Sequence, residues 1–154
     1  MKNGKWLFKF IIVFIFIFAV DQAIKYLFLH GFEFKSKCIS LVLTFNKGIA
    51  FSMFGFLGNN LKFIQLFLIL ALFVYFSKEK IIKIYPIVSA ILFGAAVSNL
   101  FDRFVRGGVV DYVYWHCGFR FAIFNFADTM IDLSILLFIC FYFFKKNDKI
   151  TLRD

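Results

Sequence analysis

The sequence is poor in the residues that hold metal ions or build hydrolytic triads. Among its 154 residues are two histidines and three cysteines, and none of them is spaced like the ligands of a metal site. No Ser/His/Asp pattern accompanies His30 or His116. We therefore expect no metal ion and no cofactor. The chain contains one proline and no low-complexity linker, so we expect one domain that spans residues 1–154.

Polar residues are also scarce for a chain of this length. Hydrophobic residues make up 62% of the sequence and the mean hydropathy is +0.86, whereas a soluble domain averages about 45–50% apolar residues. Such a chain has more apolar surface than its own interior can hide, and a lipid bilayer accepts the excess. We interpret the 27 phenylalanines as lipid-facing bulk.

A membrane-spanning helix needs about 20 mostly apolar residues. Four stretches qualify, at residues 6–29, 61–77, 84–101 and 126–144. The first is similar to a secretory signal peptide, but Asp21 and Gln22 stand where small residues would mark a cleavage site. Pro86 suits the first turn of the third helix. The expected fold class is an all-α integral membrane protein with four transmembrane helices.

The connections on one side of these helices contain β-like sequence. Residues 40–45 are typical of a strand and residues 46–48 of a turn, while residues 109–115 and 119–124 form a second candidate pair. We therefore expect a small extracytoplasmic β layer against the helix ends. Residues 51–56 suit either a lid or a segment in the membrane interface.

The three cysteines leave one question open. Cys140 falls in an apolar stretch and is expected in the core or against lipid. Cys38 and Cys117 both fall on the predicted outer side, so a disulfide between them is conceivable, but spacing alone does not establish its geometry.

The net charge of +9 does not indicate a nucleic-acid partner, because the basic residues follow the membrane pattern. Residues 1–9, 78–83 and 145–154 hold ten of the 18 basic residues in 25 positions. The two other connections, residues 31–62 and 103–122, hold seven in 52 positions. Lysine and arginine concentrate in cytoplasmic loops. We expect both termini and the 78–83 loop in the cytoplasm.

Ionisable groups in spanning segments are costly, so each is a candidate functional residue. Asp21 and Lys25 stand four residues apart, in the order that favours an ion pair on a helix, and we interpret them as a structural pair. Asp102 shares a helical face with Asn99 and Arg106 and is followed by Arg103. A carboxylate beside two guanidinium groups stays ionised, so Asp102 is expected to brace the structure.

Two other aspartates suit catalysis better. Asp111 lies in an apolar stretch without a basic neighbour, which raises the pKa of a carboxyl group. Asp128 falls where the fourth helix begins; if Asn125 caps that helix, Asp128 occupies its third position, where a purely structural capping role is the alternative. Two carboxyl groups in a partly dry site share one proton. One then activates water while the other polarises a peptide carbonyl.

Five short blocks of the sequence, in this order, resemble the signal peptidase II (lipoprotein signal peptidase) family. They cover residues 21–128 and read DQAIK at 21–25, NKGIAF at 46–51, NLFDR at 99–103, VVDY at 109–112 and FNFAD at 124–128. The resemblance implies a bacterial inner-membrane aspartic endopeptidase. Such an enzyme removes signal peptides from prolipoproteins and cuts just before the diacylglyceryl-modified cysteine. It implies diacylglyceryl-prolipoprotein substrates and membrane lipid as partners, and we expect a monomer.

The same resemblance assigns roles to residues of this chain. Asp111 and Asp128 take the positions of the catalytic pair. The positions that support the pair or hold substrate are Asn46, Asn99, Arg103 and Asn125, and conserved or structural polar positions are Asp21, Lys25 and Asp102. Ser98 and Ser52 replace glycines that are usual in the family, and Asp132 is an extra acid on the same helix face as Asp128.

Two other functions compete with the peptidase. A small transporter or channel subunit would use Asp21, Lys25 and Asp128 as a polar path. A membrane assembly factor would use its acids only to hold helices together. In the transporter, Asp111 would have no task, because it falls in a connection outside the helices.

The distribution of basic residues yields a testable topology. A single cysteine placed at residue 80, in a variant without the native cysteines, should react with membrane-impermeant reagents only after the cells are opened. A cysteine at residue 35 should react in intact spheroplasts. Labelling of residue 80 from outside would overturn this orientation.

Overall fold

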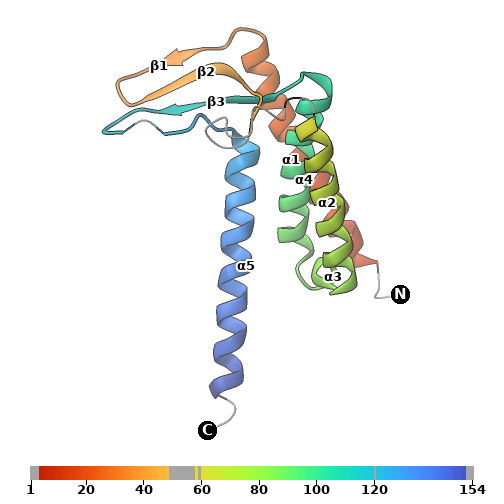
Figure 1. Cartoon of the computed structure of the whole chain (residues 1–154). Helices are drawn as coiled ribbons and strands as arrows, with labels where there is room; N and C mark the ends of the chain where they lie inside the picture. Colours follow the sequence, from red (N-terminus) through yellow and green to blue (C-terminus); the bar gives the residue numbers. More distant parts are fainter. Residues whose placement is uncertain (1–3, 49–57, 59, 120, 152–154) are drawn as a thin grey trace.

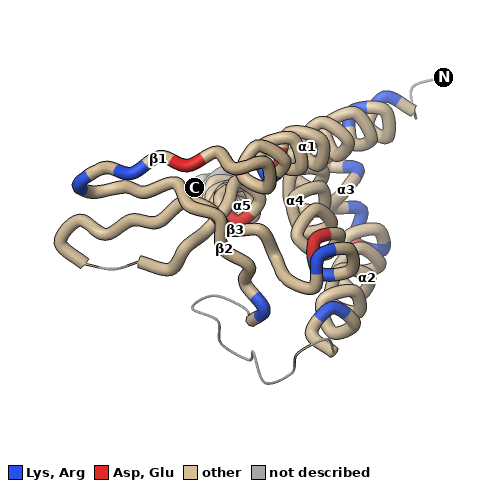
Figure 2. The backbone as a smooth tube through the Cα atoms, turned by 90° about the horizontal axis from the view of Figure 1, so that it is seen from above, with Lys and Arg blue, Asp and Glu red and all other residues tan. Residues whose placement is uncertain are grey.

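The computed structural model describes residues 4–48, 58, 60–119 and 121–151, and Figure 1 shows a bundle of helices with a sheet across one end. The helices are α1 (Lys5–Leu29), α2 (Leu61–Lys78), α3 (Ile81–Ile84), α4 (Pro86–Val105) and α5 (Phe126–Thr151). The strands are β1 (Phe34–Lys35), β2 (Ile39–Asn46) and β3 (Val109–Trp115). Helix α1 begins and helix α5 ends at the end away from the sheet. Seen from above, the sheet extends to one side of the bundle (Figure 2).

Four of the helices are long and apolar enough to cross a membrane, as the sequence predicts. Most large apolar side chains of α1, α2 and α5 are exposed, for example Phe8 at 67% and Phe67 at 68%, which suits contact with lipid. The third spanning helix begins later than expected. Tyr85 leaves helical geometry, with φ −123° and ψ 61°, because the residue before a proline disfavours it. The short helix α3 is thereby separated from α4.

The sheet is antiparallel in the order β1-β2-β3 and differs in part from the expected β layer. Strand β2 confirms the strand predicted at residues 40–45. Strand β3 pairs mainly with β2, from Ile39 opposite Trp115 to Asn46 opposite Val109. The expected pairing of residues 109–115 with residues 119–124 is reduced to a bridge between Val113 and Phe124. Strand β1 was not predicted, and residues 51–56 lie outside the described part of the chain.

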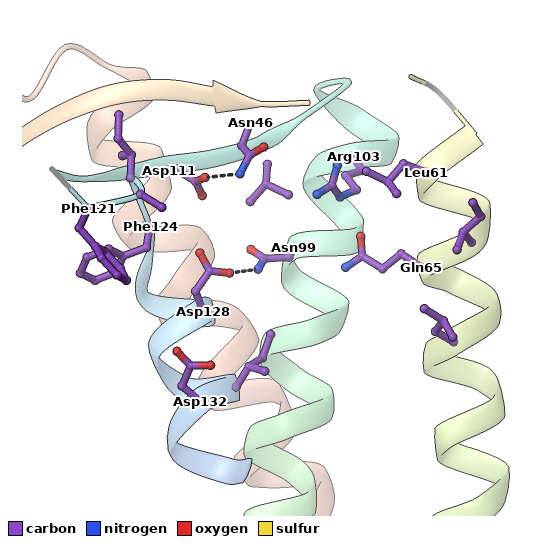
Figure 3. Close-up of a pocket in the computed structure, with 16 residues that line it drawn as sticks. Asn46, Leu61, Gln65, Asn99, Arg103, Asp111, Phe121, Phe124, Asp128 and Asp132 are labelled. Atoms are coloured by element: carbon purple, nitrogen blue, oxygen red, sulfur yellow. Dashed lines mark hydrogen bonds between the residues drawn. The ribbon is translucent and has the colours of Figure 1, made fainter. Parts of the chain in front are cut away.

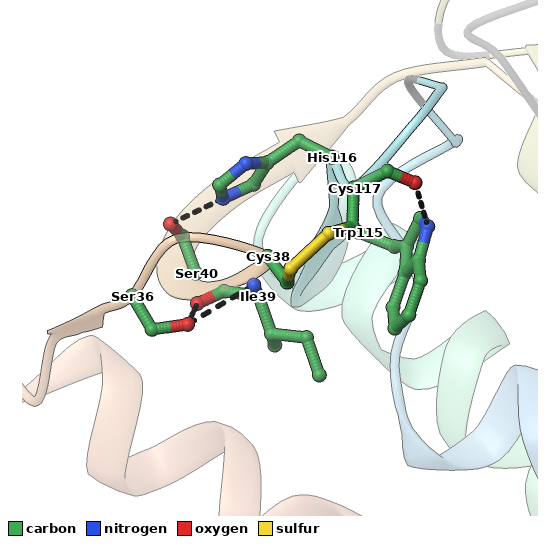
Figure 4. The surroundings of a disulfide bond; sticks show 7 residues. All are labelled: Ser36, Cys38, Ile39, Ser40, Trp115, His116 and Cys117. Atoms are coloured by element: carbon green, nitrogen blue, oxygen red, sulfur yellow. Dashed lines mark hydrogen bonds between the residues drawn. A yellow bond between two sulfur atoms is a disulfide. The ribbon is translucent and has the colours of Figure 1, made fainter.

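A disulfide closes the far end of this sheet (Figure 4). It joins Cys38, just before β2, to Cys117, just after β3, across a sequence separation of 79 residues. The open question of their pairing is thus answered in favour of the bond. Ser40 and His116 add a side-chain hydrogen bond of 3.0 Å beside it.

Helix α4 forms the centre of the bundle, with most of its side chains buried. Small residues on α4 let its neighbours approach closely, as is usual between membrane helices. At Gly94 an added Cβ atom would lie 2.8 Å from the carbonyl oxygen of Phe14 and 3.3 Å from Cβ of Ile17. Helix α1 therefore packs directly on the backbone of α4.

This contact predicts that Gly94→Ala destabilises the protein. The backbone of α1 has to shift to admit a methyl group, and overpacking of this kind costs about 1–3 kcal/mol. Thermal unfolding of the purified protein in detergent should show a lower midpoint. Gly4→Ala is the matched control, because nothing lies within 4 Å of its added Cβ atom. Equal midpoints for both variants would show that the helices have room to separate.

Candidate active site

The beginning of α5 confirms the cap expected from the sequence. The Oδ1 atom of Asn125 accepts a hydrogen bond of 2.9 Å from the backbone N–H of Asp128. In return, Oδ2 of Asp128 accepts one of 3.2 Å from the backbone N–H of Asn125. This reciprocal pair satisfies two of the N–H groups that a helix start leaves free. It also fixes the carboxylate of Asp128 at the sheet end of the bundle.

Asp111 reaches the same place from strand β3. Its side chain is buried, with 2% of its surface exposed. Its two carboxylate oxygens accept hydrogen bonds from different amides, at 3.0 Å from Nδ2 of Asn46 and at 2.7 Å from Nδ2 of Asn125. Asn46 is held in turn by a turn at the end of β2, where its Oδ1 accepts the N–H of Gly48 at 2.9 Å. Sheet and helix thus present their aspartates to one site.

Asn99 of α4 completes the set of asparagines around the two acids (Figure 3). Its Nδ2 donates to Oδ1 of Asp128 at 2.8 Å. Its Oδ1 accepts from Nδ2 of Asn125 at 3.1 Å. Asn125 therefore contacts both Asp111 and Asn99, and a continuous chain of hydrogen bonds joins the two carboxylates. The structure thus brings together five of the residues that the sequence singled out, namely Asn46, Asn99, Asn125, Asp111 and Asp128.

Burial and charge set the acidity of Asp111. Removal from water raises its pKa, and the nearby charge of Asp128 raises it further. The hydrogen bonds from Asn46 and Asn125 lower it, so the pKa settles at about 6. Asp111 therefore keeps its proton much closer to neutral pH than an ordinary aspartate does.

The two acids line a cavity of about 440 Å³ (Figure 3). Its walls are mostly apolar and come from α2, α4, α5, β3, residues 121–124 and the end of β2. Arg103 also lines it, donating from one Nη to the carbonyl oxygen of Gly48. The Nε atom of Arg103 is buried and has no hydrogen-bond partner within the described part of the chain. Asp132 lies on the cavity wall one helical turn beyond Asp128.

A second buried network lies beside this site. The Nζ atom of Lys25 is 2.6 Å from Oδ2 of Asp21 and 2.7 Å from Oδ2 of Asp102, and all three side chains are fully buried. The predicted Asp21–Lys25 pair is thereby confirmed and extended to α4. Lys25 also donates to Oδ1 of Asn99 at 2.8 Å, which links this network to the cavity.

The partners of Asp102 differ from the expectation at one position. Arg106 pairs with Asp102, and the backbone N–H of Val110 donates to it at 3.2 Å. The ion pairs of the described residues do not join Arg103 to Asp102. Consecutive helical residues point in directions about 100° apart, so Arg103 faces the cavity while Asp102 faces α1. Arg103 belongs with the candidate site and not with the structural network.

Four contacts in and beside these networks were not foreseen from the sequence. Ser98 donates to Oδ2 of Asp21 at 2.6 Å, and Gln22 donates to Ser98 at 2.8 Å and to Asp102 at 3.1 Å. The hydroxyl oxygen of Tyr112 accepts the N–H of Phe126 at 3.0 Å. Gln22 and Tyr112 fall within the blocks of family resemblance, DQAIK and VVDY, and membership of those blocks is the signal that could have pointed to them.

Comparisons with known proteins agree on one family. The profile of signal peptidase (SPase) II matches residues 13–144. The lipoprotein signal peptidase of Helicobacter acinonychis (strain Sheeba) is 54% identical over 147 residues, which are 94% of either chain. The lipoprotein signal peptidase of Wolinella succinogenes is 51% identical, and the matched region covers 92% of this chain and 97% of that protein. A solved structure of a bacterial membrane enzyme superposes with a TM-score of 0.75 at 27% identity, covering 91% of this chain and 90% of that one.

The buried ion network predicts that Asp102→Asn destabilises the fold. Removal of one partner from a buried ion pair lowers the free energy of unfolding by about 3–5 kcal/mol. We expect a loss at the lower end of this range, because Lys25 still pairs with Asp21 in the variant. The midpoint of thermal unfolding in detergent should fall clearly. Glu33→Gln is the control, because its ion pair with Lys35 is exposed and worth little. Full stability together with complete loss of peptide cleavage would move Asp102 into the reacting centre.

Proposed function

The chain belongs to the signal peptidase II family and removes signal peptides from prolipoproteins, and we propose that it does so as an aspartic endopeptidase with Asp111 and Asp128 as its reacting pair. The observation that carries the proposal is the hydrogen-bonded chain through Asn125 and Asn99, which joins both carboxylates at one cavity. Family membership supports a protease, and the geometry supplies the two acids that this chemistry needs.

In the proposed reaction the pair holds one proton between its two carboxyl groups. The charged carboxylate takes a proton from a water molecule, whose oxygen attacks the carbonyl carbon of the scissile peptide bond. The protonated carboxyl group donates its proton to the carbonyl oxygen, which gives a neutral tetrahedral intermediate. As the C–N bond breaks, the amine nitrogen takes a proton from the acid that the water protonated. The intermediate's hydroxyl proton returns to the pair, which regains its starting state.

Arg103 and the cavity walls are proposed to hold the substrate. A substrate cut at the membrane has to be non-helical at the scissile bond, so its peptide groups need new partners. The unpaired Nε of Arg103 offers a donor to such a carbonyl oxygen. The apolar walls suit a signal peptide and the diacylglyceryl chains on the cysteine that follows the scissile bond. Asn46 and Asn99 keep the acids in position.

The chain is a multi-pass bacterial membrane protein, and we propose its orientation and assembly as follows. Both termini lie in the cytoplasm and the cavity opens toward the outer face of the cytoplasmic membrane. The concentration of basic residues in residues 1–9, 78–83 and 145–154 supports this orientation. A monomer suffices for the chemistry, because one chain supplies every group of the proposed site. The comparisons give the transporter alternative no corresponding support.

Asp111→Asn and Asp128→Asn should each abolish cleavage without unfolding the protein. An amide keeps the shape and the hydrogen bonds of one oxygen, but it does not exchange the proton of the pair. We expect turnover to fall by about 10²–10⁴-fold. The assay is cleavage of a diacylglyceryl prolipoprotein by purified protein in detergent, with the new N-terminus identified by mass spectrometry. Near-normal turnover by either variant would exclude that residue from the pair.

Asp132→Asn distinguishes the pair from a set of three acids. None of the described hydrogen bonds or ion pairs joins Asp132 to Asp111 or Asp128, so we expect this variant to keep most of the turnover. Thermal unfolding of all three variants is measured in parallel to test that each is folded. If the turnover of Asp132→Asn fell as far as that of Asp128→Asn, we would conclude that three carboxyl groups share the proton.

A further inference from the structure

A second cavity lies at the end of the bundle away from the sheet. It has a volume of about 210 Å³ and lies between α1, α2 and α3. Aromatic rings of Trp6, Phe10 and Phe73 form one part of its lining. The polar part consists of Ser77, Lys80 and Lys83, and no acidic residue is among the described residues that line it. The proposed peptidase chemistry uses none of these side chains.

The backbone at Lys80 is unusual. With φ 57° and ψ 18° it is the one non-glycine residue at positive φ within the described part of the chain. This left-handed conformation is costly for most side chains, and glycine or asparagine takes it more readily. The turn between α2 and α3 therefore does not require lysine for its shape. Such an outlier points to a role for the side chain itself.

The surroundings of the cavity are apolar. Leu7 and Phe73 are 45% and 40% exposed on the outside of the helices, where lipid chains lie. Trp6 is partly buried against the aromatic cluster around Phe10 and Phe93, and tryptophan favours the level of the lipid headgroups. The cavity thus joins an apolar slot to two ammonium groups at the membrane surface. A soluble anion would bind the two ammonium groups but would leave the apolar part of the cavity without a partner.

We propose that this cavity binds one anionic phospholipid, with its phosphodiester between Lys80 and Lys83 and the start of an acyl chain against Phe10 and Phe73. Basic pockets between membrane helices on the cytoplasmic side recognise such headgroups. The bound lipid ties α1 to the α2–α3 turn. The site is separate from the proposed peptidase site, which lies at the sheet end of the bundle.

A diffuse attraction between positive loops and anionic lipid is the competing explanation. Figure 2 shows further basic residues at the start of α1. Lys5 and Lys9 line a different hollow on that helix, together with Phe8. They point about 100° around α1 from Trp6 and Phe10, respectively, since consecutive helical residues are rotated by about 100°, and they are not among the described residues that line the proposed cavity. Neutralising Lys5 therefore changes the general charge of this end but leaves the proposed cavity intact.

Trp6 offers a local probe of the site. The chain has two tryptophans, and Trp115 lies at the end of β3 beside the disulfide. In a Trp115→Phe background, the full-length protein is placed in phosphatidylcholine vesicles. In one series part of the lipid is replaced by brominated phosphatidylglycerol, and in the other by brominated phosphatidylcholine. The bromine atoms on the acyl chains quench tryptophan fluorescence on contact. The ratio of the two quenching curves gives the preference of the Trp6 site for the anionic lipid.

We expect a preference of about five-fold or more, the factor that corresponds to one lysine near a membrane surface. Lys80→Asn with Lys83→Gln should bring the preference close to one. Asparagine tolerates the left-handed backbone, so this variant keeps its thermal stability in vesicles without anionic lipid. Lys83→Gln alone, which leaves the turn unchanged, should give an intermediate preference. Lys5→Gln should keep the full preference.

Absence of a preference in the parent protein would overturn the proposal. An equal loss in Lys5→Gln and in the double variant would also overturn it, in favour of diffuse attraction. Prolipoprotein cleavage in detergent is measured in parallel on the double variant and should be unchanged. The peptidase assignment and the lipid site therefore succeed or fail independently.

Discussion

Both polar networks, the buried ion cluster and the hydrogen-bonded chain around Asp111 and Asp128, depend on the buried ammonium group of Lys25. It lies within 2.8 Å of oxygens from Asp21, Asp102 and Asn99. Without it, the buried carboxylate of Asp21 would lose its cationic partner among the described residues and Asp102 would keep only Arg106, which is strongly unfavourable in a spanning region. Through Asn99 the same group fixes the amide that donates to Asp128. The position of the candidate site thus rests on an ion cluster that takes no part in the proposed chemistry.

The helix packing and the ion cluster support each other. Asp21 accepts the N–H of Ala127 at 3.0 Å with its second oxygen, so the same carboxylate that pairs with Lys25 also satisfies the first turn of α5. The buried hydroxyl of Ser98 on α4 donates to the oxygen of Asp21 that also pairs with Lys25. α1, α4 and α5 are therefore joined by polar contacts at the level where the apolar packing ends.

The sequence predicts what depends on local patterns and misses what depends on distant partners. The spanning helices follow from apolar length, and the cap of α5 follows from Asn125 and Asp128 at three residues' spacing. The pairing of β2 with β3 joins segments about 70 residues apart, and no short-range pattern encodes it. The side of α4 that Arg103 faces also depended on the final packing. The family resemblance placed Arg103 in the site, whereas its charge and its position next to Asp102 predicted that it would pair with that carboxylate.

The same contacts suggest which acid of the proposed pair carries the proton at rest. Asp128 accepts a backbone N–H at the start of α5, where the helix dipole favours a negative charge, and it accepts a second hydrogen bond from Asn99. Asp111 accepts only side-chain amides and is almost fully buried, and its pKa of about 6 reflects that burial together with the charge of Asp128. We therefore propose that Asp111 holds the shared proton and that Asp128 carries the charge. In that arrangement Asp111 polarises the scissile carbonyl, and Asp128 acts as the base toward water. Because Asn125 contacts Asp111 through its Nδ2 and caps α5 through its Oδ1, the residue that starts the helix also bridges the two members of the proposed pair.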